Sequence, residues 1–377
     1  MGRGKSFDWW LFAVGLVLSI SGLVYIYSAT WVPPDPPGPN FLDQYGHLGL
    51  AVRQGLFLIF ALLVFSLVRR FNWGTKPESW LWFYVPVAAL LALVLVIGSV
   101  KGGSQRWLSL GAVDLQPSEF AKLGLILILA WLYSAEPSVV RKRYALALSL
   151  TASLLLLVML QPDLGTSMVF LFIFFVMSLF SSVPRRWILI TALGLVLLSV
   201  PAWFMLKDYQ KARITAFMNP SSDPQGSGYH LLQSRIAVGS GGLTGKGFLR
   251  GTQVRGGFIP VIESDFIFAL VAEEFGFVGC VYLLLLYFLL LARILALTRD
   301  AKTAYERFIC YGASAMIVFH VFIAAGMTIG LTPITGIPLP LVAYGGSSLL
   351  TTWTLLAMCE SVFANSRREF RSLRYRR

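Results

Sequence analysis

Long apolar segments recur along this chain, separated by short polar stretches. A helix needs roughly 20 apolar residues to cross the hydrocarbon of a bilayer. Ten segments approach that length, at residues 11–31, 49–68, 79–99, 118–135, 144–160, 165–182, 187–206, 265–296, 307–330 and 343–364. The pattern predicts an all-α integral membrane protein with about ten transmembrane helices.

The polar stretch at about 207–264 is the only one between these helices that exceeds about 30 residues. No soluble module is therefore expected, and residues 1–377 are predicted to form a single polytopic membrane domain. That domain has a large loop between its seventh and eighth helices and a basic tail at about 366–377. An internal repeat of the kind common in secondary transporters is not visible, which weakens a transporter function.

Composition agrees with a membrane setting. Hydrophobic residues make up 56% of the chain and charged residues 13%, with a mean hydropathy of +0.72. These values exclude an ordinary soluble domain. The 3 cysteines fall inside predicted helices, which favours packing over a disulfide framework. The 3 histidines have no ligand-type spacing, so no His or Cys metal site is predicted.

The basic residues of the short loops predict the orientation, because cytoplasmic loops hold an excess of Lys and Arg. One side of the membrane collects most of them, namely Arg3, Lys5, Arg69, Arg70, Lys76, Arg141, Lys142, Arg143, Arg185, Arg186, Arg293, Arg299, Lys302, Arg307 and the tail. Both termini are therefore predicted to be cytoplasmic. The loop at about 207–264 is then extracytoplasmic.

Seven basic residues in that extracytoplasmic loop run against the usual bias: Lys207, Lys211, Arg213, Arg235, Lys246, Arg250 and Arg255. The net charge of +13 does not indicate nucleic-acid binding, since the other basic residues are scattered over short loops without an aromatic-interleaved groove. The run at 367–377 is typical of a topology signal that also contacts anionic membrane lipids. The basic loop therefore needs its own explanation.

Polar residues between the third and fourth helices form the first candidate site. Glu119 and Lys122 stand three apart and project from one helix face. Charges at membrane depth normally face the bundle interior and pair, so one interpretation is a structural ion pair that joins two helices. The other is that Arg106 and Lys122 donate to a phosphate, with Trp107 as a flat wall. Both interpretations can hold.

Two further polar turns interrupt the apolar pattern. At residues 161–167, Asp163 precedes a helix and is expected to cap it. Residues 335–340 contain two prolines and residues 344–348 contain paired glycines, so no continuous helix can form there. Broken backbone at membrane depth is tolerated only beside protein or a water-filled cavity. A cavity is therefore expected here, with Ser347 and Ser348 as candidate ligands.

The end of the long loop carries a carboxylate at the mouth of the eighth helix. Small residues follow Asp265 at heptad-like spacing, at Ala269, Ala272, Gly276 and Gly279. Such a stripe lets another helix or a lipid chain approach closely. Glu263 stands two residues before Asp265 and would therefore point away from this stripe if the helix extended back through it. Asp265 is either an N-terminal helix cap or a chemical group, and the basic residues before it favour the second interpretation.

Together these motifs resemble the SEDS family of shape, elongation, division and sporulation proteins. The resemblance is carried by residues 102–122, 161–166, 229–235, 239–247, 251–253, 265–269, 335–340 and 344–348, and so spans nearly the whole chain. The Gly251-Thr252-Gln253 motif and the short N-terminus are more similar to elongation members than to division members. Residues 261–264 depart from the family pattern, so no role is carried over to them.

The resemblance implies a ten-helix peptidoglycan glycosyltransferase that polymerises lipid II at the outer face of the bacterial cytoplasmic membrane. A class B penicillin-binding protein is the implied transpeptidase partner. The family's essential acidic residue falls on Asp265. Candidate ligands for pyrophosphate or sugar are Arg106, Trp107, Glu119, Lys122, Arg213, Arg235, Lys246, Ser347 and Ser348.

The residue types suit transfer better than hydrolysis. Glycosidases use two carboxylates, partly because their leaving oxygen must be protonated. Pyrophosphate is already a good leaving group, so one Asp as base and several cations suffice. A divalent cation is neither required nor excluded. Two other functions remain open, a lipid II flippase and a non-catalytic scaffold for a penicillin-binding protein.

Overall fold

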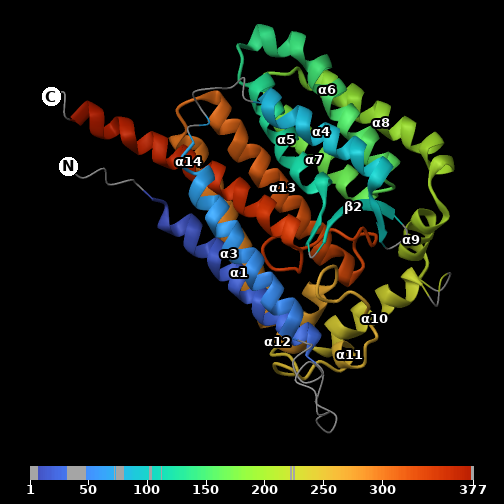
Figure 1. Cartoon of the computed structure of the whole chain (residues 1–377). Coiled ribbons are helices and arrows are strands. Elements are labelled where there is room, and N and C mark those ends of the chain that lie inside the picture. Colours follow the sequence, from blue (N-terminus) through green and yellow to red (C-terminus); the bar gives the residue numbers. More distant parts are fainter. Residues whose placement is uncertain are drawn as a thin grey trace.

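The computed structural model describes residues 7–31, 48–71, 73, 80–101, 104–111, 113–220, 223 and 226–374 (Figure 1). The helices within this part of the chain are α1 (Trp9–Thr30), α3 (Leu48–Val68), α4 (Trp80–Ile97), α5 (Pro117–Tyr133), α6 (Pro137–Leu160), α7 (Leu164–Leu179), α8 (Arg185–Met205), α9 (Asp208–Met218), α10 (Ser227–Ser240), α11 (Thr252–Arg255), α12 (Ile267–Asp300), α13 (Ala304–Ile329) and α14 (Gly346–Arg374).

Each of the ten predicted transmembrane segments coincides with one of these helices, and the helical membrane class is confirmed. Within the described residues, α1, α3, α6, α8, α12 and α13 are long and apolar enough to cross a membrane. The helices α5 and α7 are shorter, with 17 and 16 residues. The count of ten crossings therefore stays a prediction. Arg3, Lys5, Lys76 and the last three residues of the basic tail lie outside the described residues.

A small antiparallel sheet between α4 and α5 was not anticipated. Its strands are β1 (Ser99–Lys101), β2 (Ser104–Leu110) and β3 (Val113–Leu115), in the order β1-β2-β3. Ser99 pairs with Trp107, and Leu108 pairs with Leu115. Two of the strands have 3 residues each, too few to give an alternating hydropathy pattern. The sheet fixes the position of the first candidate site.

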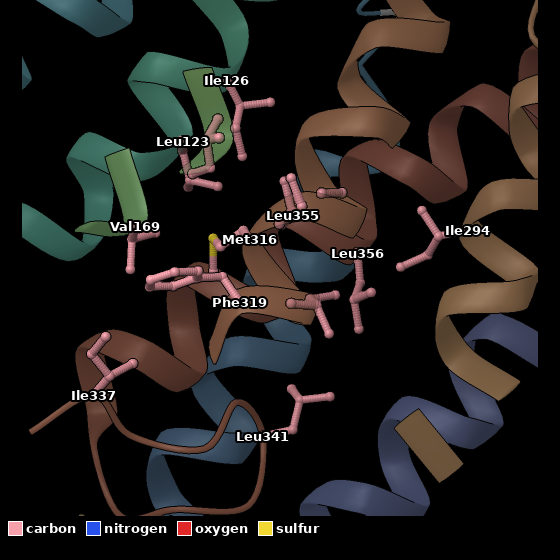
Figure 2. Close-up of a cluster of buried hydrophobic side chains, with 14 of the residues drawn as sticks. Leu123, Ile126, Val169, Ile294, Met316, Phe319, Ile337, Leu341, Leu355 and Leu356 are labelled. Carbon is pink, nitrogen blue, oxygen red and sulfur yellow. The ribbon is translucent and has the colours of Figure 1, made fainter. Parts of the chain in front are cut away.

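The core forms around α5 and α13. Helix α5 contacts α4, α6, α7, α13 and α14. Figure 2 shows Leu123 and Ile126 of α5 converging with Met316 and Phe319 of α13, beside residues from α7 and α14. Helices α3 and α8 instead expose rows of large apolar side chains, as expected of helices that face lipid.

Helix α12 is kinked at Gly276, whose φ is 67°. The backbone groups freed by the kink are satisfied by the glycine-rich loop at residues 241–251. The amides of Phe277 and Val278 donate to the carbonyls of Gly242 and Leu243, at 2.9 and 3.1 Å. The small residues Ala272 and Gly276 thus contact this glycine-rich loop backbone. The expected approach of another helix is thus met by the end of α10, whose C-cap Gly241 lies against Ala272.

The chain is not helical between α13 and α14, which confirms the predicted break. The break packs beside the start of α12, since the amide of Tyr344 donates to the carbonyl of Glu263 at 2.9 Å. The start of α1 and the last turns of α14 lie at one end of the bundle, and α10 and α11 lie at the other (Figure 1). The predicted loop at 207–264 contains three of the helices, α9, α10 and α11.

Candidate functional site

A cavity of about 460 Å³ opens beside the break. Its wall comes from β2, α7, the end of α8, α9 and residues 333–335. Most of the lining is apolar, from Pro162, Leu164, Met168, Leu206, Ile214, Phe217, Met218, Pro333 and Ile334. The polar lining residues are Arg106, Tyr209, Gln210, Arg213 and Thr335. The expectation of a cavity near residues 335–348 is confirmed.

Arg106 is held at the cavity by the turn before α7. Its Nη2 donates to the carbonyl of Pro162 at 2.6 Å, and its Nη1 lies 3.5 Å from Asp163 Oδ1. Asp163 also accepts from the amide of Thr166 at 3.1 Å, so its predicted role as the cap of α7 is confirmed. The Tyr209 hydroxyl donates to the same Pro162 carbonyl at 2.9 Å. One turn therefore positions both Arg106 and α9.

Asp265 lies beside the cavity and faces Gly336. A Cβ at Gly336 would lie 3.3 Å from Asp265 Oδ2 and 3.7 Å from Arg213 Nη1. The carboxylate and the guanidinium thus meet at one glycine, whose φ of 71° suits a residue without a side chain. The N-cap of α12 is Phe266, which makes no side-chain cap bond. The interpretation of Asp265 as a helix cap is therefore wrong.

The surroundings of Asp265 raise its pKa. Burial is the largest cause of the increase, and the nearby charge of Glu263 adds to it. The hydrogen bond from Ser264 Oγ, at 2.9 Å, lowers the pKa, as do the charges of Arg213 and Arg106. A carboxylate with a raised pKa is a stronger base while it stays ionised at neutral pH. Glu263 influences this site by its charge.

Glu119 and Lys122 form the predicted ion pair, with Lys122 Nζ 2.7 Å from Glu119 Oε1. Lys122 Nζ also lies 3.0 Å from His320 Nε2, and His320 Nδ1 lies 2.7 Å from the Met316 carbonyl. The cluster joins α5 to α13, which confirms the structural interpretation. Neither residue of the pair lines the cavity, and both are buried. Their substrate-binding role stays a prediction.

The basic residues of the long loop do not form one cluster. Lys246 Nζ lies 2.6 Å from Glu273 Oε1, which also accepts from the amide of Gln253 at 2.9 Å. This contact fixes the glycine-rich loop to α12. Arg235 Nη2 donates to the carbonyl of Gly330 at 3.2 Å, at the end of α13. Of the predicted cationic ligands, the cavity lining includes Arg106 and Arg213.

Three more predicted ligands lie outside the cavity lining, in addition to Glu119, Lys122, Arg235 and Lys246. Trp107 follows Arg106 in β2, so the two side chains point to opposite faces of the sheet. Ser347 Oγ accepts from the Gln116 amide at 3.0 Å and thereby fixes the start of α14 to α5. Ser348 is buried in the first turn of α14. For these three residues a substrate contact stays a prediction.

Sequence reasoning missed the apolar wall from α9, which includes Ile214 and Phe217. Residues 208–218 contain several apolar positions, but their periodicity is too weak to predict which face of a helix they would form. It also missed His320, because nothing in the sequence relates it to Lys122 198 positions earlier. Within the part of the chain that the structure describes, no group of three or more His, Cys, Asp or Glu residues is placed to hold a metal ion.

Comparison with known proteins places this arrangement in a family. The cell cycle protein model of FtsW, RodA and SpoVE matches residues 8–368. The peptidoglycan glycosyltransferase MrdB of Escherichia coli K12 is 43% identical over 284 residues, which cover 72% of this chain and 75% of that protein. The peptidoglycan glycosyltransferase RodA of Treponema pallidum is 30% identical over an alignment of 436 positions, which covers 96% of this chain and 99% of that protein.

Solved structures agree. A chain from a peptidoglycan synthase complex, described for the coordination of polymerization and crosslinking, superposes with a TM-score of 0.79 at 34% identity, covering 96% of this chain and 98% of that one. The rod shape determining protein RodA of Thermus thermophilus gives a TM-score of 0.68 at 32% identity, with coverage of 96% and 98%. On the match to nearly its whole length, this chain belongs to the FtsW, RodA and SpoVE family of cell cycle proteins.

Proposed function

We propose that this protein is a peptidoglycan glycosyltransferase that polymerises lipid II, with Asp265 as its catalytic base. The observation that carries the proposal is the place of the Asp265 carboxylate. The carboxylate and the Arg213 guanidinium both lie next to Gly336, and the charge of Arg106 acts on the carboxylate. An apolar cavity lies beside them. The names of the relatives, which are peptidoglycan glycosyltransferases, support the same activity.

The chemistry follows from these groups. Asp265 takes the proton of the acceptor sugar's 4-hydroxyl while that oxygen attacks the anomeric carbon of the donor. The bond to the lipid pyrophosphate breaks in the same step, so the configuration inverts. The electron pair leaves with undecaprenyl pyrophosphate, and Arg106 and Arg213 stabilise its charge. No second carboxylic acid is needed, because pyrophosphate leaves without a proton.

The apolar wall of the cavity supports a lipid-linked donor. Leu164, Met168, Ile214 and Phe217 line the space next to the two arginines. A pyrophosphate bound by the arginines would place the first isoprene units of its lipid against this wall. An apolar pocket with a few placed polar groups is typical of such ligand sites. The sugar would then extend towards Asp265.

The cellular setting is part of the proposal. Both termini are cytoplasmic and the Asp265 end faces outward, as the basic loops indicate; the separation of the two ends of the bundle supports this (Figure 1). A class B penicillin-binding protein is the transpeptidase partner, which the similarity to a chain of a synthase complex supports. If a divalent cation binds the phosphates during the reaction, its removal by EDTA should abolish polymerisation.

The test is polymerisation of lipid II in detergent by the purified protein with its candidate penicillin-binding partner. Detergent removes the leaflets, so transport cannot contribute. Asp265→Asn is expected to lower the rate by at least about 100-fold, the usual contribution of a positioned base. The matched control, Glu263→Gln, changes a neighbouring carboxylate and should retain polymerisation. Undiminished polymer from Asp265→Asn would exclude Asp265 as the base.

The same assay separates the two other functions. Absence of polymer under every condition, together with lipid II scrambling in liposomes, would identify a flippase. Polymer that persists with Asp265→Asn and disappears only when the partner is omitted would identify a scaffold. Polymer from the wild type that requires Asp265 excludes both.

A further inference from the structure

A second hollow lies between α1 and α12 and shares no lining residue with the cavity lined by Arg106 and Arg213. This α1–α12 trough has a volume of about 460 Å³ and is lined by Tyr25, Thr244, Phe275, Val278, Gly279 and Tyr282. The trough follows from the kink at Gly276, because the glycine-rich loop pairs with the bent backbone and leaves a hollow beside it. The glycosyl transfer proposed above makes no use of this hollow.

Aromatic rings form one wall of the trough and continue above it. The ring of Tyr25 lies 5.4 Å from that of Phe275, centroid to centroid. Phe275 lies 6.2 Å from Phe248, which lies 6.4 Å from Tyr27 in a stacked arrangement. Contacts of this kind hold the rings in place. The wall is therefore preformed rather than created by its ligand.

The trough lies at the depth of acyl chains near the end of the bundle that carries Asp265. Beyond the kink, from Val278 to Tyr282, it extends along about 6 Å of helix, at 1.5 Å per residue. From Phe277 to the end of α12 the helix is long enough to cross the hydrocarbon. Trp31 follows the end of α1 on this side, where aromatic residues mark the membrane interface.

One cation of the loop beside the trough has no partner among the described residues. Arg250 is exposed and its Cδ lies 3.4 Å from the Cβ position of Gly247, which binds α12 next to Phe275. Among the described residues, Arg250 has no ion pair, and its guanidinium has no hydrogen bond. The neighbouring Lys246 is already neutralised by Glu273. The exposed Thr244 adds a hydroxyl at the rim.

An apolar slot on a membrane-crossing helix, with an unpaired cation in the adjoining loop, fits an amphiphile with an anionic head. We propose that the α1–α12 trough binds an anionic glycerophospholipid of the leaflet on the Asp265 side, with one acyl chain along the aromatic wall and its phosphate at Arg250. The bound lipid then holds the glycine-rich loop against the kink of α12.

The test uses the full chain in nanodiscs that contain equal amounts of phosphatidylglycerol and phosphatidylcholine. The lipid retained after transfer to detergent is measured by native mass spectrometry. Val278→Trp fills the trough and should lower retained phosphatidylglycerol at least fivefold. Its control is Val281→Trp, at an exposed position of α12 that does not line the trough. Arg250→Ala should lower retained phosphatidylglycerol about fivefold, the effect of one basic residue on an anionic lipid. Its control is Arg53→Ala, at an exposed arginine of α3 that does not line the trough, which should leave retention unchanged.

Three results would overturn the proposal. One is equal retention of the two lipids by the wild type. Another is retention that does not differ between the trough variants and their controls. A third is displacement of phosphatidylglycerol by an equimolar amount of undecaprenyl phosphate or of the penicillin-binding partner, which would assign the trough to the carrier lipid or to a protein helix.

Discussion

Asp265 lacks the ion-pair partner that several other carboxylates of the bundle have. Asp163, Glu119 and Glu273 each have an ion-pair partner within 4.0 Å. Within the described residues, no such contact is made by Asp265, whose closest partner is the hydroxyl of Ser264 at 2.9 Å. Paired carboxylates hold segments together and are weak bases. Asp265 has no such partner, and it lies beside Gly336 and Arg213, which is why it is the base proposed here.

The raised pKa of Asp265 predicts the pH profile of polymerisation. Because the base must be ionised, kcat/KM should rise with pH through this pKa. Arg213 lowers the pKa, so Arg213→Gln should raise it further and move the acidic limb to higher pH. The limb is measured as the polymerisation rate at subsaturating lipid II. The control is Arg235→Gln, which removes a guanidinium bound to the Gly330 carbonyl and should leave the acidic limb at the same pH. A shift of the limb to lower pH with Arg213→Gln would contradict the effect of the Arg213 charge on the Asp265 pKa.

The Glu119–Lys122 pair predicts a double-mutant result. Lys122→Met leaves a buried carboxylate unpaired and should lower the free energy of unfolding by about 3 kcal/mol. Adding Glu119→Gln removes the orphaned charge and should restore at least half of that loss. Unfolding in mixed micelles measures both. Strictly additive losses would show that the two side chains do not stabilise the fold as a pair.

At the scale of elements, the kink of α12 and the glycine-rich loop form one unit. A Cβ at Gly276 would lie 2.6 Å from the carbonyl oxygen of Leu243, which is too close. The loop carbonyls of Gly242 and Leu243 accept hydrogen bonds from the two backbone amides that the kink leaves without a helical partner. In turn, the backbone amide of Lys246 donates to the carbonyl of Glu273. The segment just before the first turn of α12 carries Asp265. Loop packing therefore holds the helix that follows the proposed catalytic residue.

Gly276→Ala is expected to disturb this unit. Its positive φ and the absence of space together predict a loss of about 2 kcal/mol in the free energy of unfolding. Polymerisation should fall as well, since Asp265 moves with the first turns of α12. The control is Gly239→Ala in α10, where a Cβ meets nothing within 4 Å. Equal stability of the two variants would show that the kink does not depend on glycine.

At the scale of the whole molecule, a polar joint links helices at the end of the bundle where α1 starts, away from α10 and α11 (Figure 1). The amide of Asp8 donates to both oxygens of Glu360, at 3.0 and 3.2 Å. Arg293 Nε lies 2.6 Å from Asp8 Oδ2, and Arg69 Nη1 lies 3.8 Å from Glu360 Oε1. The joint thus ties the start of α1 to α14 and α12 and to the end of α3.

Arg293→Ala tests the importance of this joint. The variant leaves the buried Asp8 carboxylate without its strongest partner and should lower the free energy of unfolding by about 2 kcal/mol. Polymerisation per folded molecule should change little, because the joint is remote from Asp265. Arg299→Ala, an exposed arginine of the same helix, serves as the matched control. Loss of activity without loss of stability would show that the joint has a role in the reaction.

The sequence by itself determined the ten helical segments, the break between α13 and α14, and the cap at Asp163. These features depend on neighbours along the chain: hydrocarbon requires backbone groups to be satisfied within a helix, proline and glycine interrupt it, and Asp binds amides two or three residues away. Asp265 itself was found through family resemblance. Its motif is local, and spacing alone left it equally suited to cap a helix.

Only the tertiary structure decided which polar groups meet. Arg106 and Asp163 lie on different elements, Lys122 meets His320 from a remote helix, and Arg213 reaches Asp265 beside Gly336. The basic loop looked like one cluster in sequence, yet packing distributed its members among separate partners. Such meetings depend on how helices pack against one another, which a linear pattern does not contain. The physical reason is that a helix's hydropathy requires only an apolar surrounding, whereas a charge requires one specific neighbour.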